Sequence, residues 1–126
     1  MRSLQARYSQ HPDPMPALGE FERLLLFSVF ELGENAYGVT IRELIEERTG
    51  RTVSIGAIYT ALGRLDEKGL VRSRVQEPDG APGRPRKLYT VEPSGARALV
   101  ETYRTMRAFG DGLIPGLTEL AEATRG

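Results

Sequence analysis

A helical repeat of apolar residues follows residue 18 of the chain. The apolar positions of EFERLLLFSVFEL recur every three or four residues and are Phe21, Leu24, Leu25, Val29 and Leu32. This spacing predicts a helix that ends at Gly33. Leu26, Phe27 and Phe30 lie outside the stripe, so the helix is apolar over most of its circumference. We expect it to be covered on two sides, with a partner chain as one candidate for the second cover.

Two shorter amphipathic segments follow, with a brief link between them. In YGVTIRELIEERTG, Thr40 and Glu43 have the spacing of a capping box, so Thr40 is expected to cap a helix that ends at Gly50. After the link RTV, Ser54 is in position to cap a third helix that ends at Gly69. Its buried stripe is predicted to contain Ile55, Ile58, Leu62 and Leu65. Two short helices joined in this way predict a helix-turn-helix.

The outer face of the third helix carries side chains suited to a DNA groove. Positions off the apolar stripe are small or can form hydrogen bonds, and they are Gly56, Ala57, Tyr59, Thr60 and Arg64. Small residues allow close approach and the others supply donors, so we take these five and Ser54 as candidate DNA contacts. Tyr59 is alternatively a partly buried surface residue. Arg64 alternatively pairs with a neighbouring acid, Asp66 or Glu67.

Alternating residues after the third helix predict a β-hairpin. The first strand, residues 70–75, has a predicted inner face made of Val71, Ser73 and Val75. Residues 86–91, RKLYTV, are its natural antiparallel partner, and the Pro- and Gly-rich loop between them predicts a projecting wing. Candidate DNA contacts at the end of the wing are Arg84, Arg86 and Lys87. The sequence PGRPRK also resembles the core of an AT-hook, but strand residues follow directly and favour a wing.

A long helical pattern occupies the C-terminal part of the chain. It begins at Pro93, which suits a first helical position. Its apolar seam consists of Leu99, Tyr103, Met106, Leu113, Leu117 and Leu120. Because Gly110, Gly112 and Pro115 interrupt this seam, we expect a kink or two shorter helices. Asp111 is the expected cap of the second helix.

The charge of the chain is balanced overall but unevenly distributed. There are 17 Lys and Arg against 17 Asp and Glu, which taken alone argues against a nucleic-acid partner. Residues 48–87, however, hold nine cations and four acids, a local excess of five. Phosphate attraction depends on local charge density, so this stripe is typical of a DNA-facing edge. Accidental segregation on a solvated surface is the alternative.

The sequence contains no recognisable catalytic or metal-binding pattern. It has no cysteine, and its single histidine, His11, lies in a proline-rich segment without a second ligand or base nearby. We find no nucleophile paired with a base and no phosphate-cradling glycine loop, so we expect neither an enzyme nor a cofactor or metal. No apolar run approaches the ~20 residues of a membrane-spanning helix, and residues 1–17 lack the apolar stretch of a secretory signal. We therefore expect a cytoplasmic protein that does not enter the membrane.

Three stretches of the sequence resemble the PadR family of bacterial transcriptional regulators. They are AYGVTIRELIEERTG, SIGAIYTALGRLDEKGLV and GRPRKLYTVEPSGARAL, within residues 20–100. The resemblance implies a dimeric winged-helix protein whose C-terminal helix packs against the partner's N-terminal region. It also implies a palindromic operator and release by a small aromatic ligand.

The sequence departs from the family pattern in two places. Glu92 replaces the usual threonine helix cap, and the segment after Phe109 is short and broken by glycines. An acid still suits a helix N-terminus. The sequence has no tryptophan, which excludes a ligand pocket built on stacked indoles.

Together these patterns predict a mainly α-helical protein with a small β-hairpin wing. We expect a flexible arm over residues 1–17, a winged helix-turn-helix over residues 18–92 and a dimerisation region over residues 93–126. The expected dimer contacts are Phe27, Phe30, Leu99, Tyr103, Met106, Leu113 and Leu117.

The predicted function is that of a homodimeric DNA-binding regulator, a repressor or an activator, with repression preferred. A small aromatic effector is a further expected partner. Its binding site could include Tyr37, Tyr103 and Met106, but aromatic residues and methionine at helical spacing usually belong to a core, and we interpret these three as core. A winged-helix module that binds proteins and not DNA is the alternative function. The basic wing argues against it, since protein interfaces are enriched in aromatic residues.

Overall fold

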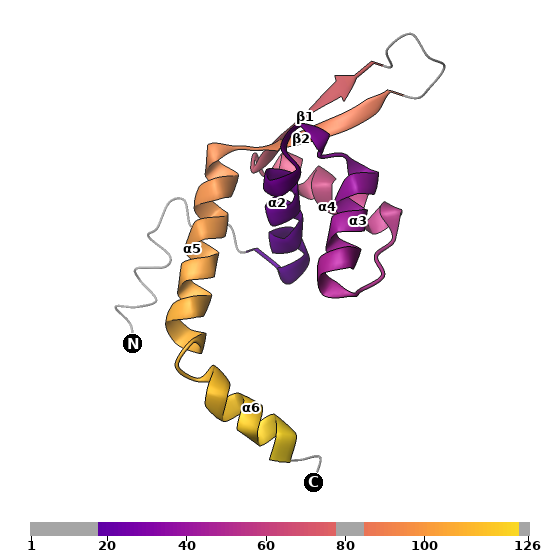
Figure 1. Ribbon diagram of the computed structural model, residues 1–126. Coiled ribbons are helices and arrows are strands. Elements are labelled where there is room, and N and C mark those ends of the chain that lie inside the picture. Colours follow the sequence, from indigo (N-terminus) through magenta and orange to yellow (C-terminus); the bar gives the residue numbers. More distant parts are fainter. Residues whose placement is uncertain (1–17, 78–84, 124–126) are drawn as a thin grey trace.

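The computed structural model describes residues 18–77 and 85–123, which form a mainly helical body with a two-stranded hairpin (Figure 1). In chain order the elements are α2 (Glu20–Leu32), the 3-10 turn η1 (Gly33–Asn35), α3 (Gly38–Thr49), α4 (Ile55–Glu67), β1 (Val71–Gln76), β2 (Arg86–Val91), α5 (Pro93–Gly110) and α6 (Ile114–Ala123). The predicted fold class is confirmed. The predicted arm over residues 1–17 and the predicted contact Arg84 lie outside the described residues.

The helix boundaries follow the capping residues seen in the sequence. Ser54 caps α4, because its Oγ accepts a hydrogen bond of 3.1 Å from the N–H of Ala57. The three predicted stops, Gly33, Gly50 and Gly69, all have positive φ, which strains any residue with a Cβ. These predictions are confirmed.

The start of α3 differs from the prediction. Thr40 is not the cap: the helix begins at Gly38, with Tyr37 as the N-cap residue. The Thr40 hydroxyl lies three positions inside, where it accepts from the N–H of Tyr37 (3.1 Å) and donates to the carbonyl of Asn35 (2.6 Å). In a capping box a glutamate side chain accepts a hydrogen bond from the N–H of the N-cap residue. The Thr40 hydroxyl accepts that bond here, because a hydroxyl can accept as well as donate. The spacing to Glu43 was therefore misleading.

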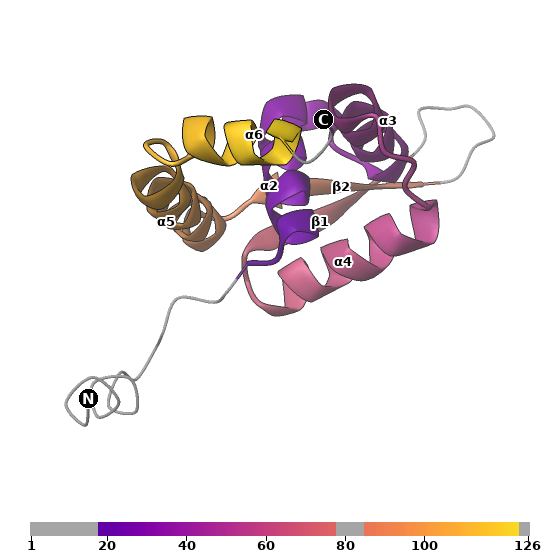
Figure 2. The same ribbon diagram turned by 90° about the horizontal axis from the view of Figure 1, so that it is seen from below.

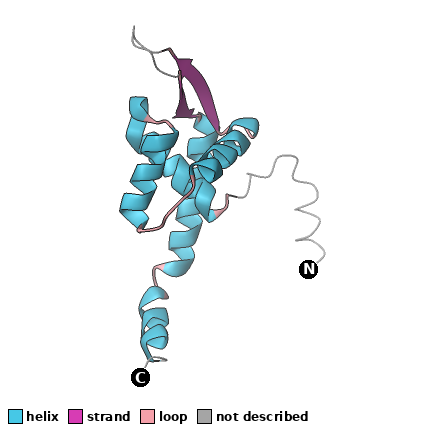
Figure 3. Cartoon of the chain, turned by 90° about the vertical axis from the view of Figure 1, so that its right-hand side faces the viewer, coloured by secondary structure: helices cyan, strands magenta, loops and turns pink. Residues whose placement is uncertain are grey.

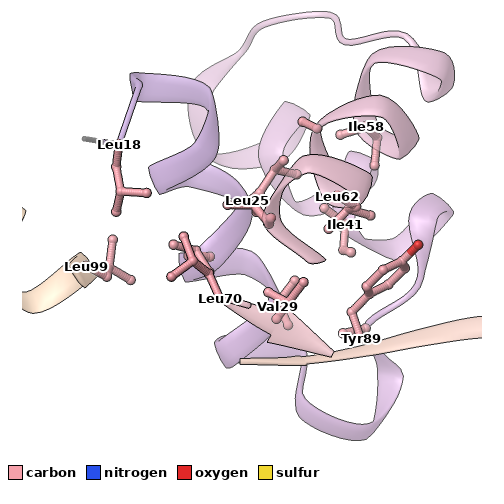
Figure 4. Close-up of a cluster of buried hydrophobic side chains, with 14 of the residues drawn as sticks. Leu18, Leu25, Val29, Ile41, Ile58, Leu62, Leu70, Tyr89 and Leu99 are labelled. Atoms are coloured by element: carbon pink, nitrogen blue, oxygen red, sulfur yellow. The ribbon is translucent and has the colours of Figure 1, made fainter. Parts of the chain in front are cut away.

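The hydrophobic core surrounds α2. This helix packs against α3, α4, α5 and β2. The largest fully buried side chains come from α2, α3, α4, β1 and the link before β1, and those labelled in Figure 4 include Leu25, Ile41, Ile58, Leu62 and Leu70. Leu26, expected outside the buried stripe of α2, is also fully buried, because several elements pack around this helix. Leu18 and Leu99 close the side of the core that faces α5 (Figure 4). Burial of these apolar side chains is the main source of stability for the body.

A carboxylate shapes the link between α3 and α4. The side chain of Glu46, on α3, accepts a hydrogen bond of 2.9 Å from the backbone N–H of Val53, just before α4. Val53 packs against the core, so its N–H would otherwise have little access to water. The bond fixes the turn of the helix-turn-helix.

The hairpin is antiparallel, with Val71 opposite Val91 at the base and Gln76 opposite Arg86 at the outer end. A hydrogen bond of 2.9 Å from the N–H of Tyr89 to the carbonyl of Ala36 anchors β2 to the segment before α3. The buried residues of the hairpin are Val71, Leu88 and Tyr89, whereas Val75, nearer the outer end, is 58% exposed, so the expected inner face does not extend that far. The reason is that the strands continue past the edge of the helical body, away from it (Figures 1 and 3).

The C-terminal region consists of two separate helices, which was one of the two expected alternatives, the other being one kinked helix. α5 ends at Gly110 and α6 begins at Ile114. α5 starts near the base of the hairpin and runs beside α2, and α6 projects beyond the body at the end away from the hairpin (Figures 1 and 3). Asp111 does not cap α6. Its φ and ψ are helical (−54° and −40°), and its carboxylate instead accepts a hydrogen bond of 3.0 Å from Nε of Arg107.

The junction of α5 with the body generates the first prediction. Gly95 lies so close to Leu70 that an added Cβ would be 2.2 Å from the Leu70 carbonyl oxygen. We expect Gly95→Ala to lower the free energy of unfolding by about 1–3 kcal/mol, because backbone atoms have to move. Chemical denaturation measures the change.

Gly63→Ala is the matched control, since nothing lies within 4 Å of a Cβ at this position on α4. Alanine is the better helix former, so this variant should be unchanged or more stable by about 0.5–1 kcal/mol. Equal stability of the two variants would contradict the close approach of α5 to Leu70.

Candidate nucleic-acid interface

The predicted reading face of α4 is accessible to solvent. All six predicted positions are exposed, and they are Ser54, Gly56, Ala57, Tyr59, Thr60 and Arg64. The opposite side of the helix is buried in the core through Ile58, Ala61, Leu62 and Leu65. The sequence therefore placed each of these residues on the correct side of the helix, and their role as DNA contacts remains a prediction.

Several cations of the basic stripe are neutralised by acids of the body. Arg48 pairs with Glu31 and Arg51 with Glu20, both on α2. Two further pairs are Lys68 with Glu22 (2.9 Å) and Arg72 with Glu92 (3.2 Å). A paired cation contributes little to attraction of phosphate, so four members of the stripe do not add to a DNA-binding surface.

The remaining cations lie on the hairpin and the outer face of α4. In the described part of the chain, no ion pair involves Arg64, Arg74, Arg86 or Lys87. The alternative that Arg64 pairs with Asp66 or Glu67 is wrong there, and Asp66 instead accepts a hydrogen bond of 3.3 Å from the hydroxyl of Ser73. The positive charge available to a ligand is thus concentrated on fewer residues than the sequence suggested.

Glu22 shows how the acids of α2 are held. Burial desolvates its carboxylate, which alone would raise the pKa. Hydrogen bonds from Lys68 and from the Gly19 N–H, together with the positive charges of Lys68 and Arg64, outweigh burial and lower the pKa below its usual value. The carboxylate therefore stays ionised and ties the start of α2 to the end of α4. Arg64 forms no ion pair with Glu22, but its positive charge is near enough to help lower the pKa of that carboxylate.

Three aromatic residues and Arg86 meet where the hairpin leaves the body. The guanidinium carbon of Arg86 lies 4.5 Å from the centre of the Tyr37 ring. Next to it, a Cβ on Gly38 would be 2.4 Å from the Tyr59 hydroxyl, so the Tyr59 ring packs directly on the start of α3. Burial raises the pKa of the Tyr89 phenol, and the nearby Tyr59 and Asp66 raise it further. The reading helix, α3 and the hairpin therefore share one contact region.

Sequence reasoning missed the role of Tyr37. It was interpreted as core, but the residue is half-buried and its ring contacts Arg86. No sequence signal pointed to the pair, because the two residues are far apart in the chain and each lies at the end of its own element.

A large apolar surface runs along α2, α5 and α6. Leu99, predicted as a dimer contact, is only 8% exposed and belongs to the core of its own chain, because its side of α5 faces α2. The other six predicted dimer residues are exposed: Phe27, Phe30, Tyr103, Met106, Leu113 and Leu117. The interpretation of Tyr103 and Met106 as core is therefore wrong. The sequence prediction also missed Phe109, which is 77% exposed.

Between α2 and α5 this surface forms an open groove of about 690 Å³. Its walls include Phe27, Phe30, Val100 and Tyr103, and Arg104 and Arg107 also line it. The rings of Phe27 and Tyr103 pack edge to face, with centroids 6.2 Å apart. The groove is therefore one part of the exposed apolar surface along α2, α5 and α6. The rest of that surface continues onto α6, which turns away from the direction of α5 (Figure 2).

Neither a membrane segment nor a metal site is found in the part of the chain that the structure describes. None of the described helices combines the length and hydropathy needed to cross a bilayer. Within residues 18–77 and 85–123, no three His, Cys, Asp or Glu side chains are grouped so as to hold a metal ion.

Comparison with known proteins gives one consistent result. Residues 26–101 match the model of the transcriptional regulator PadR-like family. A transcriptional regulator of Mycobacterium tuberculosis is 34% identical over 74 residues, which are 59% of this chain and 66% of that protein.

Solved structures agree with this match. A PadR family transcriptional regulator from Eggerthella lenta superposes with a TM-score of 0.62 at 21% identity, over 92% of this chain and 88% of that one. One from Clostridium difficile gives a TM-score of 0.63 at 25% identity, over 77% and 98%. The predicted resemblance and the predicted class, a regulator and not an enzyme, are confirmed: the chain belongs to the PadR-like family of transcriptional regulators.

Proposed function

We propose that this chain is a homodimeric, sequence-specific DNA-binding regulator. The observation that carries the proposal is a set of cations on the hairpin and α4 that form no ion pair among the described residues, beside an exposed face of small and hydrogen-bonding residues on α4. In this arrangement α4 enters the major groove, and the hairpin contacts the flanking backbone or minor groove. Arg84, outside the described residues, remains a proposed contact on the same wing.

The apolar surface of α2, α5 and α6 supports a dimer. Exposed apolar patches of this extent on a small protein mark interaction sites. A second copy that covers this surface would place two reading helices at a fixed spacing, and two-fold symmetry would then require a palindromic operator. In this proposal residues 18–92 read DNA and residues from 93 onward dimerise.

Repression with release by a small aromatic effector is the regulatory part of the proposal. The groove between α2 and α5 has aromatic walls and lies within the proposed dimer surface. A flat aromatic ligand in the groove would alter the packing of the two subunits and so the spacing of the reading helices. DNA as the partner also supports a cytoplasmic location.

The DNA-binding part is tested with fluorescence anisotropy on the duplex upstream of the chain's own gene, with a scrambled duplex as control. We expect Arg86→Ala with Lys87→Ala to weaken binding to both duplexes. The slope of log K against log salt should decrease in magnitude by about 1.8, because two phosphate contacts are lost. Tyr59→Ala should weaken binding to the upstream duplex more than to the scrambled one.

The matched control removes the same charge elsewhere. Arg48→Ala with Arg51→Ala takes away two cations that are already paired with Glu31 and Glu20, and the salt slope should stay near the parent value. If the parent protein binds neither duplex even at low salt, the DNA-binding proposal fails and a protein partner becomes the better hypothesis.

The dimer is tested by sedimentation velocity on the unmodified chain and on Met106→Glu with Leu117→Glu. Both side chains are exposed in the single chain, so the substitutions should leave its folding intact while charges oppose subunit packing. We expect the parent to sediment as a dimer and the double variant as a monomer. The control Val39→Glu, an exposed apolar residue on α3, should remain dimeric. A parent protein that is monomeric at all concentrations would contradict the proposal.

A further inference from the structure

We propose that Tyr37 is a positioning residue for DNA binding, which acts by holding the Arg86 guanidinium ready for a backbone phosphate. The inference rests on the proposed DNA-binding function and assigns a part in it to a residue outside the reading helix and the wing. Its basis is the packing of Arg86 over the Tyr37 ring, 4.5 Å from the ring centre.

The contact with the Tyr37 ring leaves the donors of Arg86 usable. Arg86 is exposed, and in the described part of the chain it makes neither an ion pair nor a side-chain hydrogen bond. A guanidinium that lies on an aromatic face keeps its N–H donors at the edge of its plane, where they fit phosphate oxygens in pairs. The ring therefore orients the group without occupying the atoms that bind phosphate.

Tyr37 is itself a firmly held platform. Its N–H donates to the Thr40 hydroxyl, and the preceding carbonyl of Ala36 accepts from Tyr89 on β2. The following residue, Gly38, packs under Tyr59. The ring thus stands at the point where α3, α4 and the hairpin meet, and a guanidinium bound to it is held in a constant position relative to the reading helix.

The neighbouring cation provides the contrast. Lys87 follows Arg86 on β2, and consecutive strand residues point to opposite faces. No aromatic ring contacts Lys87 among the described residues. A long free side chain loses its rotamer freedom when it binds phosphate, whereas Arg86 has already lost much of it in the free protein. The two cations should therefore depend on Tyr37 to different degrees.

The test is a double-mutant cycle measured by anisotropy on the duplex upstream of the chain's own gene. Tyr37→Leu removes the ring but no charge, and we expect the affinity to fall about two- to five-fold, as is typical for loss of an exposed cation–π contact. Tyr37→Phe keeps the ring and should bind like the parent. In an Arg86→Ala background Tyr37→Leu should cause no further loss, whereas in a Lys87→Ala background its full effect should remain.

A second pair of variants tests the same idea without altering Tyr37. Arg86→Lys keeps the charge but loses the planar group, so affinity should fall by a similar factor, whereas Lys87→Arg should bind at least as well as the parent. Thermal unfolding of each variant shows whether the fold is retained.

The outcomes separate the two proposals. If Tyr37→Leu weakens binding equally with and without Arg86, or if Arg86→Lys binds like the parent, the positioning role is overturned. If neither Arg86→Ala nor Lys87→Ala changes the affinity or its salt slope, the proposed DNA-binding surface itself fails.

Discussion

The structure depends on the burial of α2 at the centre of the helical body. Leu25, Leu26 and Val29 on its inner side are almost completely removed from water. They hold α3, α4 and the base of the hairpin in one core. On the other side of the same helix, Phe27 and Phe30 remain exposed beside α5. A single helix therefore supports α4 and the hairpin with one face and exposes aromatic side chains on the other. In the proposed dimer, this one element would link DNA binding and subunit packing.

Electrostatics divides the surface in a way that the net charge hides. The acids of α2 form ion pairs with cations of the body: Glu20 with Arg51, Glu22 with Lys68 and Glu31 with Arg48. These exposed pairs add little to stability. Their consequence is spatial, because they leave unpaired positive charge on the hairpin and α4. A chain with equal numbers of acids and bases can in this way present a positive edge to DNA.

The sequence predicted local structure well wherever a short-range signal existed. The Ser54 cap, the three glycine stops and the strand at residues 86–91 depend on backbone geometry or alternation within a few residues, and all agree with the structure. The predictions that were wrong concern competing local partners. The Thr40 hydroxyl accepts a hydrogen bond from the N–H of Tyr37 from a position inside the helix, and the Asp111 carboxylate accepts one from Arg107. Neither residue therefore acts as the expected helix cap.

By itself, the sequence determined the order of the elements, the buried stripes of α3 and α4 and the family, because periodicity, capping and turn chemistry act over a few residues. Only the tertiary structure decided which cations of the basic stripe have no ion pair among the described residues, since Arg48, Arg51, Lys68 and Arg72 each pair with an acid distant in the chain. It also placed Leu99 in the core and Met106 on the surface of the same helix, because burial depends on which face meets α2. The contact of Tyr37 with Arg86 belongs to the same class: it exists because Ala36 pairs with β2 and brings the two residues together.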